Sequence, residues 1–283
     1  MSIIILRECR IGILAGDKDL WLDTVNDLTI SNTTERTLVP RKNLYNRNNT
    51  NAVIHRNNDS TSGTFTCYLT SAYAEALLFN LLGCEVYEQG FVVPNMLPEL
   101  NHVTPAKFVI ASDINAYEVL DVLITSVTFP LGKGFSGEIQ VSFEGGELQQ
   151  VPRSSIQVFN TKQGAHLPVE PLEFTFNEVA YAPISANINI AQSVTWLNNR
   201  SIYDSYNTRR PVVTGHSVNI TTSQYHKQEA ILPSFENITI KQGSVQLTLE
   251  QASITRRIAL EDEMVTLSCD IQPSSAMPII QII

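Results

Sequence analysis

Residues 120–129 read Leu-Asp-Val-Leu-Ile-Thr-Ser-Val-Thr-Phe, and residues 138–145 read Glu-Ile-Gln-Val-Ser-Phe-Glu-Gly. Apolar and polar side chains alternate along both stretches, which is typical of β-strands with one buried face. The residues between them include Gly132, Gly134 and Gly137, which suit a turn. The two stretches therefore predict a β-hairpin.

A similar pattern returns near the C-terminus. Residues 246–256 and 264–270 are again strand-like, and the acidic turn Glu261-Asp-Glu263 separates them. Alignment of Ser126-Val-Thr128 with Ser253-Ile-Thr255 places the second hairpin about 127 residues after the first. A tandem duplication of this kind predicts two related units, and repeated units favour an assembly or a surface over a single catalytic cleft.

Length and composition agree with two units. The 283 residues fit two domains of about 100–150 residues each. A hydrophobic content of 43% is enough for two cores. The net charge of −9 argues against general affinity for nucleic acid, because phosphate binding needs a positive surface.

The pattern along the chain predicts a mainly β protein with one or two short helices. We expect an N-terminal arm at 1–25, a first β domain at 26–150, a linker at 151–170, and a second β domain at 171–283 that ends in an apolar tail. The clearest helix is expected from Ser71, a good N-cap, to Leu82, with Gly83 at the C′ position. A weaker one is expected at 228–232.

Two polar excursions interrupt the predicted strands. The first follows Pro40 and continues to Asn58, and the second runs from Asn198 to Arg210 and ends at Pro211. Each has the same place in its unit, between two early strands. This equivalence favours a shared role for the two excursions.

No motif indicates catalysis, a metal site or a cofactor. The five histidines lack the spacing of a zinc site, and neither a nucleophile elbow nor a phosphate-binding loop is present. We expect the four cysteines to be reduced and structural. No stretch approaches the 18 or so apolar residues of a membrane span, and the apolar start is too short for a signal peptide. We therefore expect no catalytic residue, metal, cofactor or membrane partner.

The chain resembles the tail tube protein family of long, noncontractile-tailed bacteriophages. Thr125-Ser-Val-Thr128 and the strand Ile139–Gly145 carry the resemblance, and Ala252-Ser-Ile-Thr255 with Val265–Asp270 repeat it in weaker form. The resemblance implies two tandem β-sandwich or partial-barrel domains. It also implies a self-assembling structural subunit of a phage tail tube, whose stacked trimeric, pseudo-hexameric rings form a conduit for genome ejection.

The same resemblance implies partners and a location. Partners would be other copies of the chain and the tape measure, terminator and distal tail proteins, while DNA passes through without specific binding. The protein would belong to the virion tail and occupy the host cytoplasm during assembly.

Two groups of residues are then candidates for function. Polar residues of the two return strands would face the lumen: Glu138, Gln140, Ser142, Glu144, Thr266, Ser268 and Asp270. Cationic residues of the two excursions would contact the adjacent ring: Arg41, Lys42, Arg47, Arg200, Arg209 and Arg210.

Two alternatives remain open at this point. One is another ring-forming phage tail protein, such as a distal tail or terminator protein. The other is a receptor-binding or carbohydrate-binding β-sandwich module that uses Trp21 or Trp196 as a stacking platform.

Overall fold

The computed structural model describes residues 10–16, 18–22, 25–43, 46–70, 75–87, 90–92, 104–112, 115–135, 137–156, 165, 167–168, 170–176, 179–181, 183–198, 209–225, 235–261, 264–274 and 279–282. Within these residues the fold is mainly β, as predicted, with one short α-helix and one 3-10 turn. No described helix is long and apolar enough to span a membrane.

The first half of the chain contains β1 to β10 and the helix α1. Their bounds are β1 (Arg10–Ala15), β2 (Lys18–Leu22), β3 (Asn26–Asn43), β4 (Asn46–Tyr68), α1 (Ala76–Leu81), β5 (Glu85–Tyr87), β6 (Gly90–Val92), β7 (Ala106–Ala111), β8 (Ala116–Gly132), β9 (Glu138–Gly145) and β10 (Leu148–Val151), followed by the 3-10 turn η2 (Arg153–Ser155).

The second half contains β11 to β18. Their bounds are β11 (Leu172–Phe176), β12 (Val179–Tyr181), β13 (Pro183–Asn198), β14 (Arg209–Tyr225), β15 (Phe235–Gln242), β16 (Val245–Glu261), β17 (Met264–Pro273) and β18 (Ile279–Ile282). Both predicted hairpins are confirmed, as β8–β9 and β16–β17.

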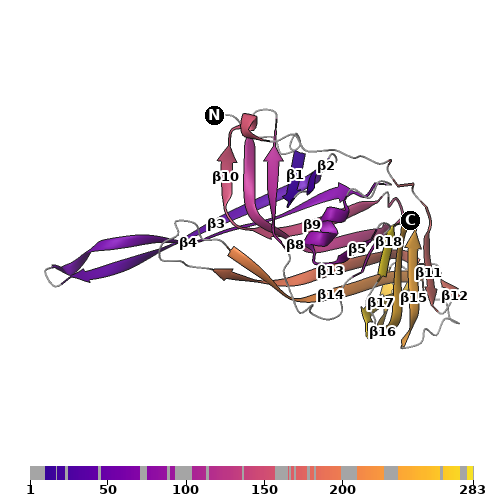
Figure 1. The fold of residues 1–283 in the computed structure, drawn as a ribbon. Coiled ribbons are helices and arrows are strands. Elements are labelled where there is room, and N and C mark those ends of the chain that lie inside the picture. Colours follow the sequence, from indigo (N-terminus) through magenta and orange to yellow (C-terminus); the bar gives the residue numbers. More distant parts are fainter. Residues whose placement is uncertain are drawn as a thin grey trace.

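One antiparallel sheet passes through both halves (Figure 1). Its central part has the order β3-β4-β9-β8-β13-β14-β17-β16. The halves join where Ser126–Gly132 of β8 pairs with Ser185–Ala191 of β13. The second half thus extends the sheet of the first.

A second layer forms because β8 and β16 each change partners at a bulge. Asp121 has a φ of +54° and Gln251 a φ of +56°, in the left-handed region that bulges use to redirect a strand. β8 pairs with β10 up to Val119 and with β7 up to Val122, and from Leu123 onward it pairs with β9 and then β13. The layers meet in an apolar core, where the Phe108 ring of β7 lies 5.2 Å from that of Phe143 and 6.4 Å from that of Phe65 between centroids.

The strands of the two halves pair in the same order. The counterparts are β1 and β11, β2 and β12, β3 and β13, β4 and β14, β7 and β15, β8 and β16, β9 and β17, and β10 and β18. The bulge pair Asp121 and Gln251 stands 130 residues apart, and beyond the bulge between Ile124 and Ser126 the separation is 129, so pairing sets a register two to three residues different from the sequence alignment. Descent from a tandem duplication stays a prediction.

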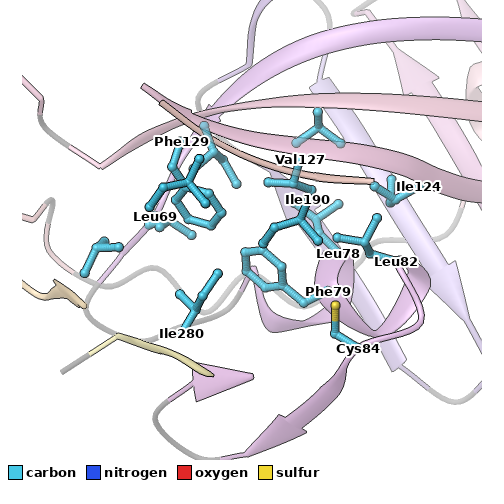
Figure 2. Packing of buried hydrophobic residues seen from close by; sticks show 14 of the residues in the cluster. Leu69, Leu78, Phe79, Leu82, Cys84, Ile124, Val127, Phe129, Ile190 and Ile280 are labelled. Carbon is cyan, nitrogen blue, oxygen red and sulfur yellow. The ribbon is translucent and has the colours of Figure 1, made fainter. Parts of the chain in front are cut away.

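The helix α1 packs on the sheet as its apolar face predicts. Phe79 stacks on Phe129 of β8, with ring centroids 6.0 Å apart and planes 8° from parallel (Figure 2). Gly83 follows the helix with a φ of +75°, which confirms the predicted C′ glycine. The predicted N-cap Ser71 and the predicted helix at 228–232 lie outside the described residues.

The first and the last described strands both take part in the sheet. The segment expected to form an N-terminal arm holds β1 and β2, and β1 pairs with β7. The apolar C-terminal tail docks as β18 between β16 and β6, with Ile280 fully buried, as its composition predicts. Of the linker expected at 151–170, the structure describes Val151–Ile156 and a few isolated positions.

The first polar excursion continues the strands β3 and β4, and the prediction that the strand ends at Pro40 was wrong. Of the second excursion the structure describes Asn198 at the end of β13 and Arg209 and Arg210 at the start of β14. Pro40 pairs with Ala52 inside the β3–β4 hairpin, and Pro211 pairs with Trp196 inside β13–β14. In the described residues each proline has a neighbouring strand on one side, the kind of position in which a sheet tolerates proline. Both hairpins project toward the same side of the molecule (Figure 1).

Candidate functional site

One face of the central sheet is lined by polar side chains in register. Thr66, Gln140, Thr128, Asn189 and Asn219 are successive pairing partners across β4, β9, β8, β13 and β14. The Thr128 hydroxyl donates to Asn189 Oδ1 at 3.1 Å. The row continues to β17, where the side-chain amide of Gln272 donates to Asn219 Oδ1 at 3.4 Å. We call this surface the polar face.

The predicted lumen-facing residues all lie on the polar face: Glu138, Gln140, Ser142 and Glu144 on β9, and Thr266, Ser268 and Asp270 on β17. Alternation puts their neighbours Ile139, Val141 and Phe143 into the core, where they are at most 1% exposed. The structure therefore brings the two groups onto one surface, although β8, β13 and β14 lie between β9 and β17. That this surface lines a lumen stays a prediction.

The polar face carries more hydroxyl and amide groups than charges. Trp196 Nε1 donates to Glu144 Oε2 at 2.9 Å, and the Thr29 and Thr64 hydroxyls lie 2.8 Å apart. Arg257 and Asp270 form an exposed ion pair at 3.9 Å, a contact that contributes little to stability. Of the charged residues named on this face, three are carboxylates (Glu138, Glu144 and Asp270) and one is a cation (Arg257), a balance that does not attract a polyanion.

The buried ionisable groups Glu75, Cys67, Cys84 and Cys269 lie in the core and not on the polar face. Burial raises the pKa of the Glu75 carboxyl, while hydrogen bonds from the backbone N–H and hydroxyl of Thr70 oppose that shift. Burial also raises the pKa of Cys84 to about 12, and Cys67, Cys84 and Cys269 are free and buried. Thiols in this state are inert, which agrees with the structural role predicted for these three cysteines. Cys9 lies outside the described residues. Among the described residues, no cluster of side chains could hold a metal ion.

The candidates for contact between rings fall on the two projecting hairpins. The structure places Arg41 and Lys42 in β3, Arg47 in β4, and Arg209 and Arg210 in β14. Arg200 lies outside the described residues. Two hairpins that point the same way can reach a common neighbour, but the contact itself stays a prediction.

Two open sheet edges are a feature that the sequence reasoning missed. In the described part of the chain, β3 pairs with β4 alone, and β16 beyond Ile254 pairs with β17 alone. Ile258 lies on this stretch of β16 and is 62% exposed, although it stands opposite the buried Leu267. The one signal in the sequence is an isoleucine between Arg257 and Ala259, which by itself does not indicate an edge.

Comparisons with known proteins agree over nearly the whole chain. The model of the Bacteriophage Baseplate Tube Protein Family matches residues 1–282. Baseplate tube protein p140 of Escherichia phage T5 is 21% identical over 270 residues, which cover 91% of this chain and 90% of p140.

Proposed function

This chain belongs to the bacteriophage baseplate tube protein family, a family of structural tail proteins rather than enzymes, and we propose that it builds the wall of a DNA conduit at the baseplate end of the tail. The chain is thus a phage tail tube protein and a component of the virion tail. Its assembly into rings, the face that lines the channel and the passage of DNA are parts of the proposal.

Three chains would close one ring. Each contributes the eight strands of its central sheet, which gives 24 strands around the ring. At a spacing of about 4.8 Å between strands, the wall has a circumference of about 115 Å and a diameter of about 37 Å, and strand tilt widens it further. Such a barrel admits duplex DNA. The single observation that carries the proposal is the sheet that continues across the β8–β13 junction.

The polar face would line the lumen. The opposite face is covered by the second layer and the core, so the polar face is the surface available to water within a closed wall. Its hydroxyls, amides and scattered carboxylates would keep a hydrated and mildly negative wall. DNA would pass without binding, since binding needs cationic groups that release counterions.

The two projecting hairpins would contact the adjacent ring. Their shared direction and their equivalent place in the two halves support this role. The cationic residues on them would pair with acidic groups of the neighbour. Deletion of residues 40–52 should therefore leave the fold and the ring intact but prevent stacking.

Partners would be other copies of the chain and neighbouring tail proteins, including tape measure and distal tail proteins, with assembly in the host cytoplasm. Electron microscopy of the purified protein over a range of concentrations, together with native mass spectrometry, tests the proposal. Trimeric rings with a central channel, alone or stacked, are the expected result. Monomers under every condition would contradict it and favour a binding module.

A further inference from the structure

The pairing of β8 with β13 inside the chain has an equivalent that two copies of the chain can form with each other. At the junction of the two halves, β8 and β13 are antiparallel neighbours in the sheet. Phe129 stands opposite Ile188, and both side chains are fully buried. One position earlier, Thr128 stands opposite Asn189 on the polar face, and the two side chains are hydrogen-bonded at 3.1 Å.

The counterpart of β8 is β16, and the bulges fix the register between them. Asp121 of β8 and Gln251 of β16 are equivalent bulge residues, so equivalent positions next to them are 130 residues apart in the sequence. An additional bulge in β8, between Ile124 and Ser126, reduces the separation to 129 beyond that point. Ile258 therefore corresponds to Phe129. The β17 pairings agree: Ile258 stands opposite the core residue Leu267, and Arg257 stands opposite Ser268 on the polar face.

The counterpart of β13 is β3, and another pair of bulges fixes this register. Between β3 and β4, Glu35 pairs with Asn58 but the next residue, Arg36, pairs with Arg56, so one residue of β4 is skipped. Between β13 and β14, Ser193 pairs with Gly215 but the next residue, Val194, pairs with Val213, so one residue of β14 is skipped. The bulged residues are Asn57 and Thr214, and the residues that precede the step on the partner strands are Glu35 of β3 and Ser193 of β13, so β3 and β13 are 158 residues apart. Ile30 therefore corresponds to Ile188, and Ser31 to Asn189.

Both counterparts are the open edges of the central sheet. Ile258 is 62% exposed where Phe129 is fully buried, and Ile30 is half-buried where Ile188 is fully buried. The difference is that β8 and β13 cover each other, whereas β16 and β3 have no such neighbour among the described residues. An open edge with an exposed isoleucine favours pairing with another chain.

We propose that β16 of one copy pairs antiparallel with β3 of a second copy, in the register that β8 and β13 use within the chain. Ile258 then lies opposite Ile30 of the second copy, and Arg257 lies opposite its Ser31. The two edges differ, so the contact is head-to-tail and can close a ring. The inference rests on the proposed function and adds to it the surface by which the ring closes.

Cysteine pairs on the polar face test the register. The double variant Arg257→Cys with Ser31→Cys replaces two exposed side chains, so the fold should not change. Thr128→Cys with Asn189→Cys, the equivalent pair inside the chain, is the calibration for disulfide formation. We expect mild oxidation to give the calibration variant an intramolecular disulfide, and the test variant dimers and trimers that reductant returns to monomers.

Two controls make the outcome decisive. Arg257→Cys with Thr29→Cys shifts the register by two residues on the same face and should form roughly tenfold less disulfide, because the sulfur atoms are then too far apart. The exchange Ile258→Asp should abolish the ring, whereas Tyr225→Asp, at another exposed site, should retain it.

Failure of the inferred contact is distinguishable from failure of the proposed function. If native mass spectrometry shows trimers but the Arg257→Cys with Ser31→Cys variant forms no disulfide between chains, the inferred contact is overturned and the tube subunit remains. A wild-type chain that stays monomeric at every concentration contradicts both.

Discussion

Gln192 of β13 donates a hydrogen bond from its side-chain amide to the carbonyl oxygen of Leu81, at a distance of 2.8 Å. The same amide nitrogen donates to the carbonyl oxygen of Ile124 in β8. A buried side chain of the second half therefore supplies a hydrogen-bond donor to a carbonyl group in the last turn of α1, which belongs to the first half. The two halves are joined by this contact as well as by strand pairing.

Replacement of Gln192 should destabilise the monomer. Gln192→Ala leaves the carbonyl oxygens of Leu81 and Ile124 buried without this donor, at a cost of about 1–3 kcal/mol in the free energy of unfolding. The neighbouring exposed Ser193→Ala should change it by less than about 0.5 kcal/mol. Urea denaturation measures both variants, and equal midpoints would contradict the assignment.

The stack of Phe79 on Phe129 should be a large contribution to the core. Phe129→Ala removes a fully buried ring and should lower the free energy of unfolding by about 3–5 kcal/mol. Tyr225 is an aromatic residue of similar size that is 54% exposed. Thermal unfolding of Tyr225→Ala should therefore resemble that of the wild type, and a comparable loss in both variants would count against the packing argument.

The packing of β4 between β3 and β9 leaves no room for a side chain at Gly63. A Cβ atom there would lie 2.4 Å from the carbonyl oxygen of Thr29 and 2.6 Å from the ring of Phe143. Gly63→Ala should thus cost about 1–3 kcal/mol through overpacking. Gly215→Ala in β14 is the matched control, since a Cβ atom there meets nothing within 4 Å. A Gly63→Ala protein as stable as the wild type would show that the strands are further apart.

His216 should make the fold sensitive to mild acid. Its Nε2 atom lies 2.9 Å from the carbonyl oxygen of Leu82, and burial lowers its pKa below the ordinary 6.5. The unfolded chain then binds a proton more readily than the folded one, so stability falls as the pH drops through 6.5 toward the lower folded pKa. The non-titrating His216→Gln should lose less stability between about pH 7.5 and 5.5. Parallel pH profiles for both proteins would rule out this contribution.

Cations on the polar face should turn the conduit into a DNA-binding surface. Gln140→Lys with Asn219→Lys adds two positive charges per chain to one row of the polar face. Rings of this variant should retain duplex DNA at low salt and release it as the salt concentration rises. Filter binding with assembled wild-type rings as the control measures the difference. Absence of DNA retention by intact variant rings would mean that the polar face does not line the lumen.

Much of the fold follows from local pattern. The hairpins β8–β9 and β16–β17 and the helix before Gly83 were predictable, because alternation, a helical apolar face and a C′ glycine are local signals. The length of β3 and β4 was not, since their outer parts pair only with each other and need no apolar period. Pro40 also suggested a strand end that the one-sided pairing makes unnecessary.

The candidate site was predictable only in part. Alternation placed Gln140 and Ser268 on solvent-facing sides of their strands, but it could not show that these sides belong to one surface. That requires the β8–β13 junction, a pairing between segments about 60 residues apart. The alignment of Ser126 with Ser253 also missed the true register, because bulges at Asp121 and Gln251 set it and bulges leave no clear mark in the sequence.

Copies of this chain would close a tube wall by extending one β-sheet. Electron cryomicroscopy of the assembled ring tests it most directly. We expect three chains and a continuous wall of 24 strands, eight from each central sheet, with Ile258 of each chain opposite Ile30 of the next and the polar face toward the channel. A ring in which β16 and β3 remain unpaired, or in which the polar face points outward, would contradict it.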